Sequence, residues 1–137
     1  MKLGFIGTGE ITKAVVIGIL GSKIKFQKIY LSKRNSKIST FLTKKSKKIQ
    51  IEKNNQDLVN KSDWVFLAVT PKVGNKIIKK LHFKRRQTIV SFISTIQLPK
   101  LKKLTKNKTN IVRAIPLPPI SLRKGPIPIF PPNKKVK

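Results

Sequence analysis

The stretch KLGFIGTGEIT, residues 2–12, decides the fold of this chain. Its first part, Lys2–Ile6, is mostly apolar and predicts a buried β-strand. A Gly7-Thr8-Gly9 turn follows at once, and the segment Glu10–Leu20 then places apolar residues at helical spacing. A strand that runs through a glycine-rich turn into a helix is typical of a βαβ unit. We therefore expect a parallel sheet flanked by helices.

The rest of the chain repeats this alternation of short apolar runs with segments of helical spacing. Further strands are predicted over residues 28–32, 49–51, 63–69, 88–93 and 110–114. Helices are predicted over residues 36–47, 56–60, 72–81 and 98–105, and Pro71 suits the first turn of the third of these. The pattern predicts an α/β fold of the Rossmann type, with a doubly wound, mostly parallel sheet in a single domain.

The composition of the chain changes after residue 115. Seven of the nine prolines lie between Pro116 and Pro132, which excludes a regular helix there. Residues 127–130, IPIF, are the candidate for one edge strand. We expect a dinucleotide-binding domain over residues 1–115, followed by a Pro-rich and basic segment over residues 116–137 and no further domain.

The composition also excludes several kinds of site. The absence of cysteine excludes disulfides and thiolate chemistry, and a single histidine, His82, argues against a metal cluster. Every apolar run is shorter than the roughly 20 residues of a membrane-spanning helix, so we expect no membrane association. Because only a short strand precedes the glycine-rich turn, there is no room for a signal peptide, and a cytoplasmic location is expected.

The net charge of +28, from 32 basic and four acidic residues, allows two interpretations. Such a surface binds polyanions non-specifically through phosphate contacts. However, only five of the basic residues are arginines, whereas dedicated nucleic-acid surfaces are usually richer in arginine and aromatic residues. The alternative is compositional drift toward lysine, with polyanion binding as a side effect. We favour drift.

The glycine-rich turn is a candidate site for the pyrophosphate of a dinucleotide. Gly7 suits the tight turn, and Gly9 lets the backbone approach the phosphates. The amide groups that start the following helix, at Glu10, Ile11 and Thr12, together with Thr8, complete an anion site. Two features depart from the usual fingerprint: Thr12 stands where a smaller residue is common, and Glu10 brings a negative charge. The alternative is a glycine turn that binds nothing.

The end of the second strand indicates which cofactor would bind. Domains that prefer NAD carry an acidic residue there, which accepts a hydrogen bond from the ribose 2′-hydroxyl. This chain has Ser32-Lys33-Arg34 instead, a hydroxyl and two cations that suit a 2′-phosphate. Arg34 is the stronger candidate because arginine is rare in the chain. Lys33 is the weaker one, since side chains alternate along a strand and Lys33 would point away from Ser32 and Arg34.

Several segments together resemble the N-terminal domain of the pyrroline-5-carboxylate reductase family. They are KLGFIGTG at 2–9, SKRN at 32–35, NQDLV at 55–59, SDWVFLAVTP at 62–71, SFIS at 91–94 and VRAIP at 112–116. The resemblance implies an NADP-binding Rossmann domain, in which Gly7, Gly9, Ser32, Arg34, Asn55, Ala68, Val69 and Pro71 contact NADPH. Asn55 is equally suited to cap a helix.

The resemblance also implies an activity, hydride transfer between NADPH and a cyclic imine in proline biosynthesis. Two departures put that activity in doubt. Leu117-Pro118-Pro119 stands where the resemblance implies Asn-Thr-Pro, and we expect the helical domain that dimerises and supplies the pyrroline site in that family to be absent. We expect either a truncated form or one that a partner completes, through a homo-oligomer or a separate helical-domain chain. The catalytic residues stay unknown. The alternative is a non-enzymatic, basic module that senses a cofactor or binds polyanions.

The basic run at the end of the second strand leads to a first prediction. NADPH should bind more tightly than NADH, by about 10- to 150-fold, because a charge-assisted contact to the 2′-phosphate is worth about 1.5–3 kcal/mol. Replacing Arg34→Asp should remove this preference while leaving NADH affinity similar, since a carboxylate repels the phosphate and accepts from the 2′-hydroxyl. Isothermal titration of both proteins with both cofactors measures the effect. Equal affinity of the wild type for the two cofactors would refute the assignment.

Overall fold

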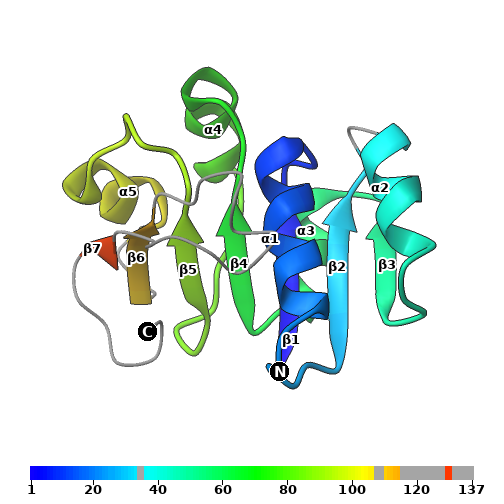
Figure 1. Cartoon of the computed structure of the whole chain (residues 1–137). Helices are drawn as coiled ribbons and strands as arrows, with labels where there is room; N and C mark the ends of the chain where they lie inside the picture. The colour runs from blue at the N-terminus through cyan, green and yellow to red at the C-terminus, as the bar shows by residue number, and fades with distance from the viewer. Residues whose placement is uncertain (34–35, 107–109, 115–128, 131–137) are drawn as a thin grey trace.

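The computed structural model describes residues 1–33, 36–106, 110–114 and 129–130 (Figure 1). Its seven strands are β1 (Lys2–Ile6), β2 (Lys28–Ser32), β3 (Ile49–Glu52), β4 (Trp64–Leu67), β5 (Thr88–Ser91), β6 (Asn110–Ala114) and β7 (Ile129–Phe130). Its five helices are α1 (Glu10–Leu20), α2 (Ser36–Thr43), α3 (Asn55–Lys61), α4 (Pro71–Ile78) and α5 (Leu98–Leu104).

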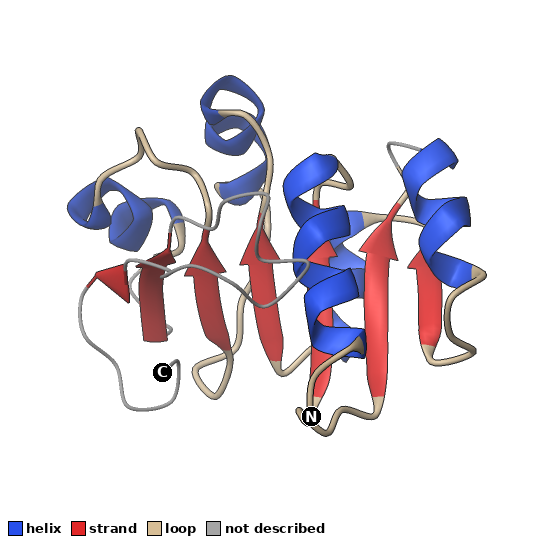
Figure 2. Ribbon diagram, in the orientation of Figure 1, coloured by secondary structure: helices blue, strands red, loops and turns tan. Residues whose placement is uncertain are grey.

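All strands belong to one sheet, in the order β3-β2-β1-β4-β5-β6-β7. The pairings from β3 to β6 are parallel, and only β7 pairs antiparallel, with β6. The carboxyl ends of the parallel strands therefore all lie on the same side of the molecule, at the top in Figure 2. The order reverses between β1 and β4, the point at which doubly wound sheets bind their ligands. The predicted fold class is confirmed.

Helices cover both faces of the sheet. In Figure 1, α1 and α2 lie in front of the strands and α3 lies behind them. On the face of α1 and α2, Val16 and Leu42 are buried against residues of β1 and β2. On the other face, a second apolar cluster contains Leu58 of α3, Ile78 of α4 and Leu101 of α5. The strands are thus buried on both sides, as their near-continuous apolar sequences require.

The largest difference from the predicted elements is at α2, which ends at Thr43 and not at residue 47. The reason is the short turn that must lead into β3. The hydroxyl of Ser46 accepts from the backbone N–H of Lys48 at 3.2 Å, and the carbonyl of Ser46 accepts from that of Ile49 at 3.3 Å. A serine that bonds to nearby backbone in this way competes with helix formation.

The predicted strands at 63–69 and 88–93 are also longer than β4 and β5. Before β4, the Asp63 carboxylate accepts from the backbone N–H of Lys2 at 2.8 Å and from Arg86 Nη1 at 3.0 Å, which fixes the start of β1 to the turn before β5. After β5, the Ser91 hydroxyl accepts from the N–H of Ile93 at 3.2 Å and turns the chain. Of the predicted edge strand at 127–130, β7 occupies residues 129–130, and the other two lie outside the described residues.

Gly7 makes the turn between β1 and α1 possible. Its φ is +96°, a conformation that residues with a Cβ rarely adopt. A Cβ built on Gly7 would also collide with the carbonyl oxygen of Ala68, just beyond β4. The turn therefore needs glycine for two independent reasons: its backbone conformation and its close approach to Ala68.

This geometry leads to a stability prediction. The Gly7→Ala variant should lose about 2–4 kcal/mol in the free energy of unfolding, through backbone strain and the clash with Ala68. The matched control is Gly21→Ala at the end of α1, where φ is −84° and the nearest atom to a new Cβ lies 3.6 Å away. The control should change stability by less than about 1 kcal/mol. Urea unfolding measures both, and equal stability of the two variants would contradict the role given to Gly7.

Candidate functional site

The glycine-rich turn is fixed from both sides by hydrogen bonds. The backbone N–H of Gly7 donates to Ser32 Oγ at 2.9 Å, which joins the turn to the end of β2. The carbonyl of Gly7 accepts from Thr12 Oγ1 at 2.6 Å, which joins it to the first turn of α1. Ser32 and Thr12 are both buried. The position of the turn is thus set by buried side chains.

Gly9 presents bare backbone at the start of α1. It is the N-cap residue of the helix, and no side chain caps the first turn. A Cβ built on Gly9 would meet no atom within 4 Å, so the space beside it is open. Free amide groups and the positive end of the helix dipole favour an anion at such a position.

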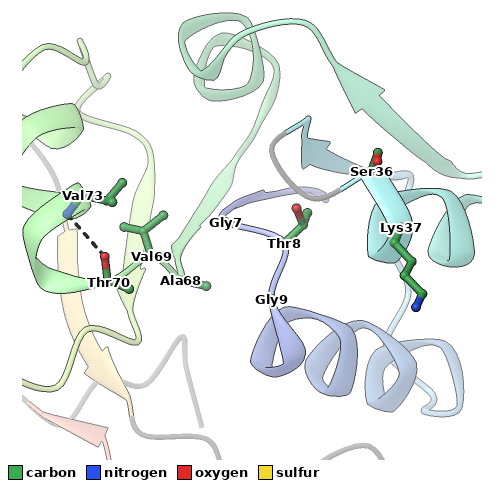
Figure 3. A pocket seen from close by; sticks show the side chains of 9 residues that line it. All are labelled: Gly7, Thr8, Gly9, Ser36, Lys37, Ala68, Val69, Thr70 and Val73. Carbon is green, nitrogen blue, oxygen red and sulfur yellow. Dashed lines mark hydrogen bonds between the residues drawn. The ribbon is translucent and has the colours of Figure 1, made fainter.

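An open cavity of about 500 Å³ lies in front of this turn (Figure 3). One wall is the glycine turn and the opposite wall is the segment that follows β4, while α2 contributes its first two residues. The lining residues are Gly7, Thr8, Gly9, Ser36, Lys37, Ala68, Val69, Thr70 and Val73. The fold therefore brings five of the residues predicted to bind cofactor, Gly7, Thr8, Gly9, Ala68 and Val69, around one space.

A second cavity of about 260 Å³ shares Gly7, Val69 and Val73 with the first. It lies between the ends of β2 and β3, and two more of the predicted residues, Ser32 and Asn55, line it. Its other lining residues are Ile6, Lys33, Lys53, Asn54 and Ile77. Together the two cavities extend from the end of β4, past the glycine turn, to the end of β3.

Four predicted residues line neither cavity: Glu10, Ile11, Thr12 and Pro71. Thr12 is fully buried, and its hydroxyl is used on the Gly7 carbonyl, so the larger side chain at this position is accommodated by a hydrogen bond. Glu10 is exposed in the first turn of α1, and Pro71 is exposed at the start of α4. Arg34 lies outside the described residues.

The capping role considered for Asn55 belongs to Asn54. The Asn54 side-chain oxygen accepts from the backbone N–H of Asp57 at 2.8 Å, and its amide donates to the Asp57 carboxylate at 3.1 Å. The sequence has two consecutive asparagines, and the cap must lie three residues before the N–H that it accepts from. Asn55 is therefore the first residue of α3 and does not cap it.

Ser32 and Lys33 both line the second cavity, although the alternation of side chains along a strand predicted that Lys33 would point away from Ser32. β2 ends at Ser32, so the alternation of a strand no longer applies to the residue that follows it.

Sequence reasoning missed Ser36, Lys37, Thr70 and Lys53. The signal for Thr70 was present, since Thr-Pro is a usual start of a helix, and its hydroxyl accepts from the N–H of Val73 at 3.5 Å. Lys53 and Lys37 carried no signal, because lysine is frequent throughout the chain.

The carboxylates near the site are engaged elsewhere. Glu52 is buried and accepts from Lys61 Nζ at 2.8 Å and from Gln50 Nε2 at 3.3 Å. The hydrogen bond to Glu52 raises the pKa of the Lys61 ammonium above its ordinary value. Within the described residues, no group of three or more His, Asp or Glu side chains could hold a metal ion. In the same part of the chain, no helix is long and apolar enough to cross a membrane.

Several curated proteins similar to this chain are pyrroline-5-carboxylate reductases. The chain is 28% identical over 128 residues to pyrroline-5-carboxylate reductase 3 of Danio rerio, with 91% of this chain and 44% of that protein covered. It is 23% identical to pyrroline-5-carboxylate reductase 2 of Bacillus subtilis, with 90% and 45% covered. The chain thus spans about half the length of the curated relatives it matches.

Solved structures agree on the fold. A pyrroline-5-carboxylate reductase from Coxiella burnetii matches with a TM-score of 0.83 and 22% identity, over 97% of this chain and 51% of that one. The Plasmodium falciparum pyrroline carboxylate reductase, solved with NADP bound, matches with a TM-score of 0.80 and 20% identity, over 98% and 50%.

The resemblance inferred from the sequence is therefore confirmed. The family described as "NADP oxidoreductase coenzyme F420-dependent" matches residues 2–95, and its description agrees with the predicted cofactor, NADP. By this match the chain belongs to that family of NADP oxidoreductases, and it is an NADP-binding domain resembling that of pyrroline-5-carboxylate reductase.

Proposed function

We propose that this chain binds NADPH for the reduction of a cyclic imine of the pyrroline-5-carboxylate kind. The observation that carries the proposal is the open cavity in front of Gly9, at the point where the strand order reverses. At this point the backbone of Gly9 has no side chain beside it, α1 begins, and Gly7 makes a tight turn with positive φ. Together these features suit a bound pyrophosphate. The names of the curated relatives supply the substrate class.

The lining residues fit the parts of a dinucleotide. The pyrophosphate would lie against Gly9 and the first turn of α1, where Glu10 and Ile11 offer backbone amides. The adenosine ribose would lie toward the second cavity, beside Ser32 and Asn55. A hydroxyl that accepts from Gly7 still has its own proton to donate, so Ser32 suits a phosphate oxygen. The nicotinamide would lie on the side of Ala68, Val69 and Pro71. When bound, NADPH supplies the hydride, and the protein supplies its position.

The substrate side of the reaction is proposed to need residues beyond this chain. Reduction of an imine requires one hydride and one proton, and the substrate must be held against the cofactor. Among the described residues, the four acids are scattered, and two of them, Glu52 and Asp63, are tied in ion pairs with Lys61 and Arg86. A substrate wall would come from a second copy, a separate helical chain, or residues outside these 137. In this proposal residues 1–115 form the cofactor domain, and Ile129–Phe130 of the Pro-rich, basic segment 116–137 add β7 to its sheet.

A turnover assay tests the substrate half of the proposal. The purified 137-residue chain should bind NADPH but show no oxidation of NADPH that depends on pyrroline-5-carboxylate. The Bacillus subtilis reductase, assayed under the same conditions, serves as the positive control. Steady oxidation that depends on the imine, in protein free of host reductase, would show that the chain holds a complete catalytic site.

A variant at Gly9 tests the cofactor half. The Gly9→Ala substitution places a methyl group in the cavity where the pyrophosphate is proposed to lie. NADPH affinity should fall about tenfold or more, equivalent to about 1.4 kcal/mol. The free energy of unfolding should fall by only about 1 kcal/mol, because the new Cβ meets no protein atom and the cost is the poorer helix cap that alanine provides. Isothermal titration and urea unfolding give the two values. Unchanged NADPH affinity in a folded variant would show that the pyrophosphate does not bind at this turn.

A further inference from the structure

We propose that Lys53, on the turn after β3, is a second determinant of the preference for NADPH and acts together with Lys33 on the 2′-phosphate. This inference rests on the proposed function, and it concerns a residue that neither the glycine-rich fingerprint nor the end of β2 contains. The observation behind it is the juxtaposition of the two lysines beside Ser32 and Asn55 in the second cavity.

The register of the sheet brings the two lysines together. β2 and β3 are parallel, and Ser32 is paired with Glu52 at their carboxyl ends. The next residue on each chain is a lysine, so Lys33 and Lys53 leave neighbouring strands side by side, where backbones lie about 4.8 Å apart. Both residues are exposed and both line the second cavity.

No carboxylate in the described part of the chain neutralises this pair. The ion pairs among the described residues are Lys61–Glu52 and Arg86–Asp63. Neither of them involves Lys33 or Lys53. Although Glu52 is next to Lys53 in the sequence, its buried carboxylate is bound by Lys61 at 2.8 Å. Asp57 is held by the side chain of Asn54.

Two like charges at adjacent strand ends repel each other, and an anion between them relieves that repulsion. The 2′-phosphate distinguishes NADPH from NADH and carries the required charge. Ser32 and Asn55, in the same cavity, add a hydroxyl and an amide that can donate to phosphate oxygens. The cavity therefore offers cations from two strand ends and neutral donors between them, in a space separate from the proposed pyrophosphate position at Gly9.

The test compares Lys53→Ala with a matched control, Lys47→Ala. Lys47 is an exposed lysine two residues before β3, whereas Lys53 directly follows the other end of the same strand. The four residues of β3 separate the two lysines by about 13 Å, more than one Debye length at 0.1 M salt. Both variants lower the net charge of the chain by one, so any general effect of charge on anion binding is common to both.

Isothermal titration with NADPH and NADH at 0.1 M salt should show a specific loss. We expect Lys53→Ala to lower the ratio of the two affinities about three- to tenfold, with NADH affinity almost unchanged. Lys33→Ala should act in the same direction, and the double variant should lose more than either single variant. Lys53→Arg should retain the ratio, and Lys47→Ala should not change it. Inorganic phosphate should weaken binding of NADPH more than binding of NADH.

The failures of the two proposals can be told apart. If the wild type binds neither cofactor, the proposed function fails and this inference fails with it. If the wild type prefers NADPH but Lys53→Ala retains the wild-type ratio, only the role of Lys53 is overturned. An equal loss of affinity for NADPH and NADH in Lys53→Ala would assign the lysine to general attraction of anions and would also overturn the inference. Far-ultraviolet circular dichroism and urea unfolding confirm that each variant is folded.

Discussion

The hydrogen bond from the Gly7 N–H to Ser32 Oγ is the contact on which the site depends. It joins β1 to β2 at their carboxyl ends, while the positive φ of Gly7 brings the turn against Ala68 beyond β4. Three neighbouring strand ends are thus fixed relative to one another by a single residue. Both cavities include Gly7 among their lining residues. A change in its backbone would alter the floor of both cavities and the direction in which α1 starts.

Much of this arrangement could be predicted from the sequence, because periodicity and turn chemistry are local signals. The bounds of β1, α1, β2 and β6 were predicted as observed, since each is an apolar run or a periodic segment with a clear end. The end of α2 was not, because lysines are compatible with a helix and only the Ser46 turn stops it. The cap of α3 was assigned one residue too late, because two consecutive asparagines offer the same chemistry.

The segments that form the candidate site could be predicted from the sequence, whereas the arrangement of its charged side chains could not. Glycines, the Ser32 hydroxyl and the segment after β4 carry recognisable patterns. The role of Lys53 depends on strand register, a contact between segments about 20 residues apart that no local pattern encodes. The same holds for Thr12, whose buried hydroxyl compensates for its size by bonding to the Gly7 carbonyl.

Three of the four carboxylates make contacts that fix parts of the fold. Asp63 ties the first residue of β1 to Arg86, Glu52 binds Lys61, and Asp57 completes the Asn54 cap. A chain with 32 basic residues and four acids cannot neutralise its charge by ion pairs, so most of its basic residues have no acidic partner. Excess charge of this kind opposes the compact state, and the two apolar clusters on either side of the sheet must offset it.

The two edges of the sheet show what this surplus of lysine does for the molecule in a crowded cell. β3, at one edge, has four residues and is flanked by the exposed Lys47, Lys48 and Lys53. β7, at the other edge, has two residues, and prolines precede and follow it in the sequence. Lysines repel an approaching strand of the same kind, and prolines lack the N–H that a foreign strand would need. Each edge is therefore a poor template for self-association into fibrils, a protection that this basic chain obtains without any residue devoted to it.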